Sequence, residues 1–170
     1  MVKTWPDYDG FSPCFLFVAA FRTPEIFTIS FCPHSYATVL HFSNDAGCGH
    51  SWLDLSLDKS TLYATDWTSP PTISSFKVVP PSSTTPFPTI GERAQAPSDH
   101  LSGYVCSNDK AVYSACGPQV DVFLIDRNLQ SLRQTKAVQS ISLVSKSKMQ
   151  DLNGESDFGG LRHGGHVSSD

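Results

Sequence analysis

Short apolar runs, separated by residues that favour turns, dominate this sequence. Each run is five to seven residues long, and most are bounded by Asp, Pro, Ser or Gly. Runs of this length and setting predict β-strands rather than helices. The eleven Phe and five Tyr against two Met also favour strands. We expect strands over ten stretches: 15–21, 25–31, 38–42, 51–55, 61–67, 73–79, 103–107, 111–115, 120–126 and 138–144.

One segment recurs at a spacing of about 50 residues. Residues 49–64 read GHSWLDLSLDKSTLYA, residues 102–114 read SGYVCSNDKAVYS, and the opening returns in 165–170 as GHVSSD. A strand, an Asp-Lys turn and a second strand ending in Tyr, repeated at this period, is typical of β-propeller blades. Trp52 and Tyr104 occupy matching positions, which predicts packing between neighbouring blades. The repeat predicts an all-β, incomplete propeller with fewer than three antiparallel blades and a ring that is not closed.

The repeat also divides the chain into parts of one partial propeller domain, residues 1–170. The first blade has only its outer strands in this interpretation, and its innermost strand must come from elsewhere. A full ring at this period needs about twice the length of this chain, so we expect a fragment or a truncated gene. The expected parts are the outer strands of a first blade (15–48), a second blade with a Pro-rich loop (49–101), a third blade (102–150), and a loop with the start of a fourth blade (151–170).

The Pro-rich loop lies between Pro70 and Pro97, where seven of the twelve prolines occur. Proline cannot donate a hydrogen bond to a strand ladder, so this stretch predicts an edge strand with long surface loops. A disordered linker between domains is the competing interpretation. The repeat spans the stretch at its normal period, which favours the edge strand.

Composition and charge narrow the possible partners and the cellular location. The formal net charge is −4, the pI is about 5.8, and Lys and Arg are not clustered, which argues against a nucleic-acid partner. Five cysteines with no C-x-x-C pair indicate reduced thiols. The apolar run 15–21 is too short to span a bilayer, and the acidic N-terminus is unlike a secretory signal. We therefore expect a cytoplasmic protein with no membrane partner.

Four stretches carry a resemblance to a known family. They are FRTPEIFTISF at 21–31, GCGHSWL at 47–53, the repeat copy at 102–114, and DFGGLRHGGH at 157–166. Together they resemble the fungal carboxy-cis,cis-muconate cyclases, lactonising enzymes among the seven-bladed lactonase propellers that also include bacterial 6-phosphogluconolactonase. The resemblance runs from about Phe15 to the last residue and covers the N-terminal part of the family's length. It implies an incomplete propeller of the seven-bladed type.

The resemblance also implies a chemistry. The family adds a carboxylate of 3-carboxy-cis,cis-muconate to its own diene without a cofactor, which needs cationic groups for three carboxylates and one proton donor. His166 matches the family's catalytic histidine, and Arg162, His163 and His50 are the candidate substrate-binding residues. The family's partner arginines and glutamate would lie beyond Asp170. We therefore expect a small tricarboxylate substrate for the full-length form, no cofactor, no metal, and an inactive chain in this form.

Each candidate residue also has a structural explanation. A histidine beside glycines at the start of a strand can cap that strand, and His50 stands one blade before His166 at the equivalent point. The spacing of His163 and His166 suits two metal ligands on a helix, but a Gly-rich loop without a third ligand disfavours a metal site. Arg162 is equally compatible with a surface ion pair.

Three functions from different classes remain open at this point. The first is an intramolecular lyase of aromatic catabolism, of which this chain is the N-terminal portion. The second is a lactone hydrolase of the 6-phosphogluconolactonase type, which needs a basic cluster for phosphate that this sequence does not show. The third is a non-enzymatic fragment that associates with itself or with another chain through open strand edges. Soluble oligomers would favour the third, and a monomer with cyclase activity would exclude it.

Overall fold

A computed structural model describes residues 4–5, 13–126, 128–129 and 131–143 of the chain, and every structural statement below concerns these residues. They form strands, turns and loops, with no helix and therefore no helix that could cross a membrane. The strands are β1 (Thr4–Trp5), β2 (Cys14–Ala19), β3 (Glu25–Cys32), β4 (Ala37–Asp45), β5 (His50–Leu55), β6 (Thr61–Asp66), β7 (Thr72–Val79), β8 (Thr89–Pro97), β9 (Tyr104–Ser107), β10 (Ala111–Cys116), β11 (Gln119–Asp126), β12 (Ser131–Leu132) and β13 (Gln139–Ser142).

The strands form three antiparallel sheets. The first has the order β1-β2-β3-β4 and the second β5-β6-β7-β8. In the third, β9, β10 and β11 follow in order, and both β12 and β13 pair with β11. Only the second sheet has four strands of ordinary length, because β1 has two residues and the last position of the third sheet is divided between two short strands. The predicted all-β, incomplete propeller with an unclosed ring is confirmed.

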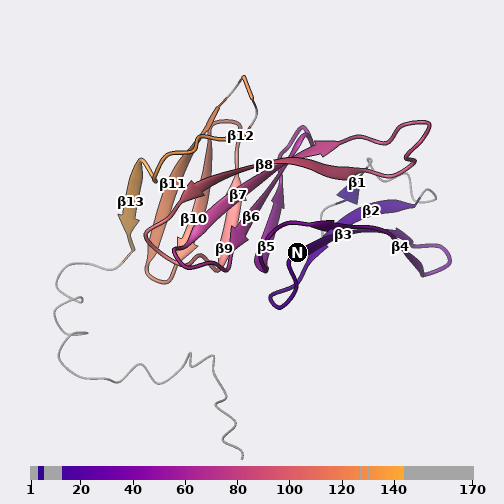
Figure 1. The fold of residues 1–170 in the computed structure, drawn as a ribbon, viewed down its shortest axis with the longest axis horizontal. Coiled ribbons are helices and arrows are strands. Elements are labelled where there is room, and N and C mark those ends of the chain that lie inside the picture. The colour runs from indigo at the N-terminus through magenta and orange to yellow at the C-terminus, as the bar shows by residue number, and fades with distance from the viewer. Residues whose placement is uncertain (1–3, 6–12, 127, 130, 144–170) are drawn as a thin grey trace, which may run out of the picture.

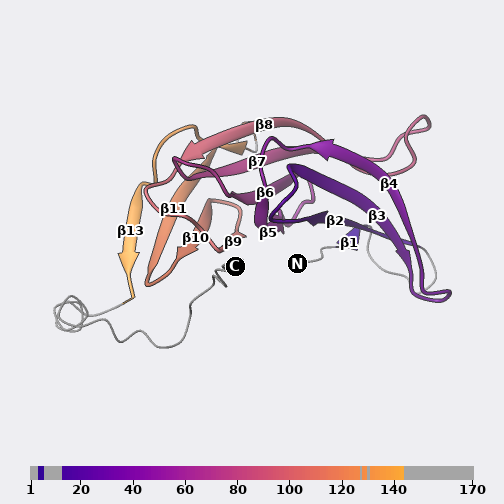
Figure 2. The same cartoon turned by 60° about the horizontal axis from the view of Figure 1, so that its bottom comes forward.

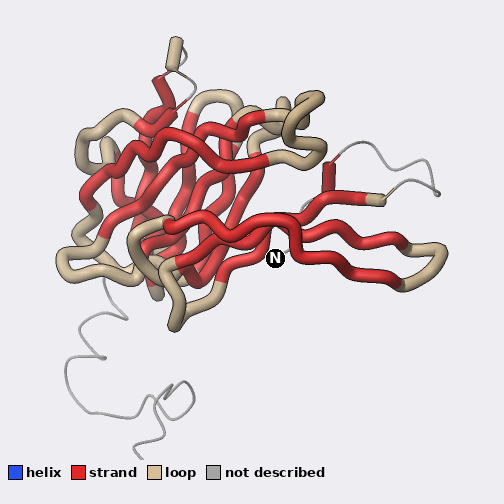
Figure 3. The backbone as a smooth tube through the Cα atoms, turned by 45° about the vertical axis from the view of Figure 1, so that its right-hand side comes forward, coloured by secondary structure: helices blue, strands red, loops and turns tan. Residues whose placement is uncertain are grey.

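The sheets lie side by side like neighbouring blades (Figure 1). In Figure 2, β5 and β9 lie on the inner side of the arc and β4 and β8 run along its outer rim. The tube in Figure 3 shows that strand makes up most of the described chain. A meander of four strands that packs face to face with the next meander is the geometry of propeller blades.

Two apolar cores fill the spaces between neighbouring sheets. The first is built around Phe17, Ile26 and Phe76, between the first and second sheets, and the second around Tyr63 and Phe123, between the second and third sheets. β6 is buried at all six positions because both faces of the middle sheet are covered. β4, in contrast, is mostly exposed. The burial of a strand therefore depends on whether neighbouring sheets cover its faces.

The ten predicted strands all overlap observed strands, and the stretch between Pro70 and Pro97 ends in the predicted edge strand, β8. β1 and β12 were not predicted. Thr4 and Trp5 pair with Leu16 and Phe15, so the expectation that the first blade lacks an innermost strand was wrong. Such a short strand carries no periodicity that a sequence could reveal. The assignment of residues 151–170 to a fourth blade lies outside the described residues, and the domain division stays a prediction.

The two copies of the strand–turn–strand segment differ in their turns. In the second sheet, Ser56 and Thr61 enclose the turn, Asp58 accepts hydrogen bonds from Ser56 and Ser60, and Lys59 has a φ of 62°. In the third sheet, the Asn108 side chain accepts from the backbone of the two residues that follow Asp109. The second turn is two residues shorter than the first. Asp-Lys therefore recurs in sequence without taking the same place in the structure.

Candidate functional site

His50, the one candidate site residue that the structure describes, is the first residue of β5. A Cβ on the preceding Gly49 would collide with the carbonyl of Phe21, so only glycine allows the chain to pass the first sheet this closely. The Gly49 carbonyl accepts a hydrogen bond from the Trp67 backbone NH (2.9 Å). This packing places the His50 imidazole inside the second sheet, where the residue is 1% exposed.

The His50 ring faces the carboxylate of Asp66, the last residue of β6 and its partner in the strand ladder. Nδ1 of His50 lies 3.0 Å from the Thr65 carbonyl and 3.1 Å from Oδ1 of Asp66. Nε2 of His50 is buried and has no hydrogen-bond partner among the described residues. The ring edge of His50 packs against Phe76, with 5.8 Å between the ring centroids. The histidine is thus held by the neighbouring strand and is closed off from solvent.

Asp66 is the centre of a larger network, which we call the His50–Asp66 cluster. Its Oδ2 accepts hydrogen bonds from the hydroxyls of Thr72 and Ser74 and from the Gln95 amide. Nη2 of Arg93 donates to the same oxygen at 3.1 Å, and Nε of Arg93 donates to the Ser74 hydroxyl at 2.8 Å. The same Nη2 lies 3.4 Å from the Cys48 sulfur. The members of the cluster are Cys48, His50, Asp66, Thr72, Ser74, Arg93 and Gln95.

The cluster sets the charge state of its acid and its thiol. Burial alone would raise the pKa of Asp66, but hydrogen bonds from His50, Ser74 and Thr72, together with the charge of Arg93, outweigh it and hold that pKa well below its ordinary value of 3.8. Burial, with the nearby Asp66 charge, raises the pKa of the Cys48 thiol. At neutral pH the cluster therefore contains a buried carboxylate, a guanidinium and a protonated thiol.

The third sheet has a second polar cluster, the His100–Asp121 cluster, made of His100, Cys116, Asp121 and Ser140. Oδ2 of Asp121 lies 3.2 Å from Nδ1 of His100 and 3.5 Å from the Cys116 sulfur, while the Ser140 hydroxyl donates to Oδ1. Asp121 is 1% exposed. Burial would raise its pKa, but the hydrogen bonds from Ser140 and His100 hold it below the ordinary value.

The two clusters occupy equivalent places in consecutive sheets. Leu53 pairs with Ala64 in the second sheet, and Val105 pairs with Ser114 in the third. Asp66 lies two residues after Ala64, and Cys116 lies two residues after Ser114, so Asp66 and Cys116 occupy equivalent positions. By the same reasoning, Cys48 corresponds to His100, because both lie five residues before these paired positions. The carboxylate itself has moved from the end of β6 to β11. The second and third sheets thus each bring an acid, a thiol and a histidine to the same end of their strands.

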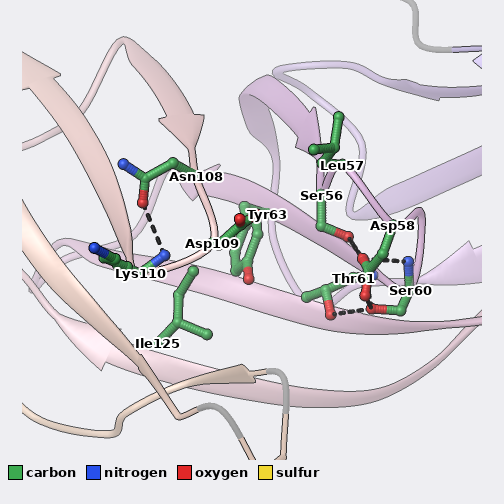
Figure 4. A pocket seen from close by; sticks show the side chains of 10 residues that line it. All are labelled: Ser56, Leu57, Asp58, Ser60, Thr61, Tyr63, Asn108, Asp109, Lys110 and Ile125. Atoms are coloured by element: carbon green, nitrogen blue, oxygen red, sulfur yellow. Dashed lines mark hydrogen bonds between the residues drawn. The ribbon is translucent and has the colours of Figure 1, made fainter.

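The described residues also line open pockets. One, of about 460 Å³, lies between the β5–β6 and β9–β10 turns, at the strand ends opposite His50 (Figure 4). Asp58 and Lys110 line it, but Asp58 is already hydrogen-bonded to Ser56 and Ser60. Another, of about 430 Å³, lies between β4 and β8 and reaches Arg93. Arg93 therefore connects the buried His50–Asp66 cluster with an open surface.

The structure places only part of the predicted site. Arg162, His163 and His166 lie outside the described residues, and His50 lies in the buried cluster, so their roles in substrate binding and catalysis stay predictions. The sequence analysis missed the residues that surround His50, above all Asp66 and Arg93. The regular register of the β5–β6 hairpin would bring Ser51 opposite Asp66, and only the shift between His50 and Leu53 brings His50 there. No local motif indicates Arg93, which lies 43 residues from His50 in the sequence.

Comparisons with known proteins agree with this architecture. The chain is 44% identical over 151 residues to muconate cycloisomerase 1 of Cutaneotrichosporon cutaneum. The resemblance to the muconate cyclases is confirmed. That match covers 89% of this chain but 39% of the relative, so the chain spans about two fifths of the length of the muconate cycloisomerase. No protein-family model matches the chain.

Two solved structures share the fold. A candidate 6-phosphogluconolactonase from Bacteroides uniformis superimposes with a TM-score of 0.61 at 20% identity, covering 76% of this chain and 37% of the other. A second candidate, from Bacteroides fragilis, has a TM-score of 0.60 at 16% identity and covers 81% and 38%. The chain therefore has the architecture of the lactonase-type propellers.

Proposed function

We propose that this chain forms part of a muconate cycloisomerase-type lactonising enzyme. The observation that carries the proposal is the 44% identity to a muconate cycloisomerase, together with a lactonase-type propeller fold. The relative is longer, so the proposal concerns this chain as one part of a larger active site. The chemistry proposed needs no cofactor, because the acid, the nucleophile and the electron-poor diene all belong to the substrate or to side chains.

The substrate we propose is 3-carboxy-cis,cis-muconate. One of its carboxylate oxygens attacks a carbon of the diene and forms the lactone C–O bond, and the adjacent carbon takes a proton. All atoms of the substrate stay in the product. His166 is the proposed proton donor, and Arg162 and His163 are the proposed partners of the substrate carboxylates. His50 is fully buried, so we assign it to positioning β5 through Asp66 rather than to direct contact with the substrate.

The experiment is a chimera in which this chain replaces the matching segment of the Cutaneotrichosporon cutaneum enzyme. Loss of the diene absorbance of 3-carboxy-cis,cis-muconate measures cyclisation. We expect an active chimera whose kcat falls by about 10²- to 10⁴-fold on His166→Gln, since a positioned acid contributes about that factor. His34→Gln, in the exposed β3–β4 turn, is the matched control and should leave kcat unchanged.

Other outcomes of the same experiment separate the alternatives. An active chimera whose His166→Gln variant keeps full activity would contradict the proposed role of His166. Hydrolysis of 6-phosphogluconolactone without cyclisation of the muconate would favour the lactone hydrolase. A folded chimera that turns over neither substrate would overturn the proposed function. We further propose a cytoplasmic location, on the ground of the cysteine usage.

A second candidate function, association through the open edge of the first sheet, is favoured by the apolar side chains of its edge strand β4. Val39, Leu40 and Phe42 are 50%, 61% and 45% exposed. An exposed edge strand that carries apolar side chains offers unpaired backbone groups and apolar surface to another chain. We expect the purified 170-residue chain to form dimers by light scattering, and the Val39→Lys, Phe42→Lys double variant to be monomeric. A monomeric wild-type chain at the highest soluble concentration would exclude self-association.

A further inference from the structure

The His100–Asp121 cluster brings three different metal-ligating groups to one point. A carboxylate oxygen of Asp121, an imidazole nitrogen of His100 and the Cys116 sulfur all lie within 4.8 Å of one another. They come from the loop before β9, the end of β10 and the start of β11, so the fold and not a sequence motif assembles them. No ligand spacing along the sequence therefore indicates this site.

We propose that His100, Cys116 and Asp121 form a binding site for a divalent cation of the zinc class. Zn²⁺ favours sulfur, imidazole and carboxylate ligands at about 2.0–2.3 Å in a tetrahedron, which puts neighbouring ligand atoms about 3.3–3.6 Å apart. The distance from Asp121 Oδ2 to His100 Nδ1 is 3.2 Å, and that to the Cys116 sulfur is 3.5 Å. Both distances are therefore close to the edges of a zinc tetrahedron.

The charge balance of the cluster favours a cation. A buried carboxylate needs a counter-charge or a metal. Asp66 has the guanidinium of Arg93 at 3.1 Å. Asp121 is buried just as deeply, but its only ion-pair partner among the described residues is His100, which carries a charge only when protonated. A divalent cation bound to Asp121 would supply the permanent charge that Arg93 supplies in the second sheet.

The surroundings are suitable for binding and for entry. Ser140 donates a hydrogen bond to the other carboxylate oxygen of Asp121 and fixes its orientation, as outer partners of metal ligands do. The His100 side chain is 40% exposed, so the site opens to solvent on that side and a water molecule can be the fourth ligand. On binding, the Cys116 thiol releases its proton to solvent and the thiolate forms the bond to the metal. No other bond changes.

The site is distinct from the proposed lactonising chemistry and does not depend on it. Its ligands tie the loop before β9 to two strands of the third sheet, so the expected consequence of binding is a more stable third sheet. The test uses Co²⁺ as the probe on the metal-free 170-residue chain. Tetrahedral Co²⁺ bound to a thiolate gives a charge-transfer band in the near ultraviolet and d–d bands in the visible, and Zn²⁺ should displace it.

We expect one equivalent of Co²⁺ to give the thiolate band in the wild type. Cys116→Ser should remove the band, and His100→Gln, at a half-exposed position, should weaken Zn²⁺ affinity by at least about tenfold; Ser140→Ala should weaken it by about 10- to 100-fold. Cys48→Ser is the matched control and should keep the band. Circular dichroism of each metal-free variant checks that it is folded.

The remaining outcomes overturn the proposal. Absence of a thiolate band in the folded wild type excludes the site. A band that survives Cys116→Ser, or one that disappears in Cys48→Ser, would place the metal elsewhere in the chain. Because the readout is spectroscopic, these outcomes are independent of any muconate or lactone assay.

Discussion

The second and third sheets each bury an aspartate near the ends of their strands, but the two carboxylates have different partners. Asp66 sits among four hydrogen-bond donors with a permanent cation, Arg93, at 3.1 Å. Asp121 accepts from one hydroxyl and is paired with a histidine and a thiol. The difference separates a carboxylate that has a permanent cation beside it from one whose ion-pair partner among the described residues is a histidine.

The strand register explains how the difference arises. β8 is nine residues long and passes the whole second sheet, so Arg93 and Gln95 can both reach Asp66. β13, its counterpart in the third sheet, is four residues long and supplies only Ser140 at the equivalent position. In the same register the position that corresponds to Arg93 is Val138, whose backbone NH donates to the Val122 carbonyl, so the third sheet has an apolar residue where the second has the cation.

The largest effect should come from removing the carboxylate of the second sheet. Asp66→Ala leaves the donors from Thr72, Ser74 and Arg93 without their acceptor inside the sheet. Breaking a buried pair by deleting one member costs about 3–5 kcal/mol, so we expect the free energy of unfolding in urea to fall by about that amount. Asp109→Ala, in the exposed β9–β10 turn, is the control and should change it by less than about 0.5 kcal/mol. Equal losses in the two variants would mean that the cluster does not hold the sheet.

Removing the cation should have the next largest effect. Arg93→Gln takes away hydrogen bonds to Asp66 and Ser74, and bonds to a charged group contribute about 1.5–3 kcal/mol each. We expect urea unfolding to show a loss of about that size, partly offset because the side chain is 25% exposed. Lys77→Gln, an exposed cation on β7, is the control. A neutral result for Arg93→Gln would remove the distinction between the two clusters, since the second sheet would then tolerate an uncompensated carboxylate as well.

The sequence predicted the strands better than it predicted the clusters, and the reason is physical. Each strand is marked by its own apolar run and by the turn residues at its ends, so local pattern is enough to find β3 or β7. The fold class followed because the strand–turn–strand unit recurs at the period of a blade. β1 was not predicted because two residues have no periodicity. The repeated Asp-Lys pair predicted equivalent turns, but Asn108, not Asp109, caps the second turn.

The clusters could not be found in this way because their members meet across strands. His50 was singled out for the glycines beside it, whereas its environment depends on Asp66, 16 positions along, and on Arg93 further on. Which side chains meet is set by register, including the shift between His50 and Leu53 that turns the imidazole into the sheet. A one-residue slip in the ladder would separate them, and no local pattern carries that information.

The contributions of Asp66 and Asp121 to the pH dependence of stability should also differ, by less than the losses expected for the two substitutions above. Both have a pKa below 3.8 in the folded protein, and the pKa of Asp66 is lowered further. Near and below pH 4 the unfolded state therefore binds more protons, so stability is full above that pH and is lost as the pH falls through the folded pKa values. We expect the urea midpoint of the wild type to fall between about pH 5 and about pH 3. Asp66→Asn should flatten this decline more than Asp121→Asn does; the reverse order would contradict the comparison.

The smallest effect should come from the thiol that faces the arginine. Cys48 is half-buried, and its described polar contact in the cluster is the long one from Arg93, 3.4 Å from nitrogen to sulfur. A thiol is a weak acceptor, and burial raises the pKa of Cys48, so the sulfur stays protonated and adds no charge that the guanidinium could use. Cys48→Ala should change the free energy of unfolding by about 0.5 kcal/mol or less. Cys116 is 6% exposed and its sulfur contacts Asp121, so Cys116→Ala should cost more in the metal-free protein than Cys48→Ala. Excess Zn²⁺ should widen that gap, because only the third sheet loses a metal ligand; a gap that stays constant with Zn²⁺ would show that the two thiols differ in packing alone.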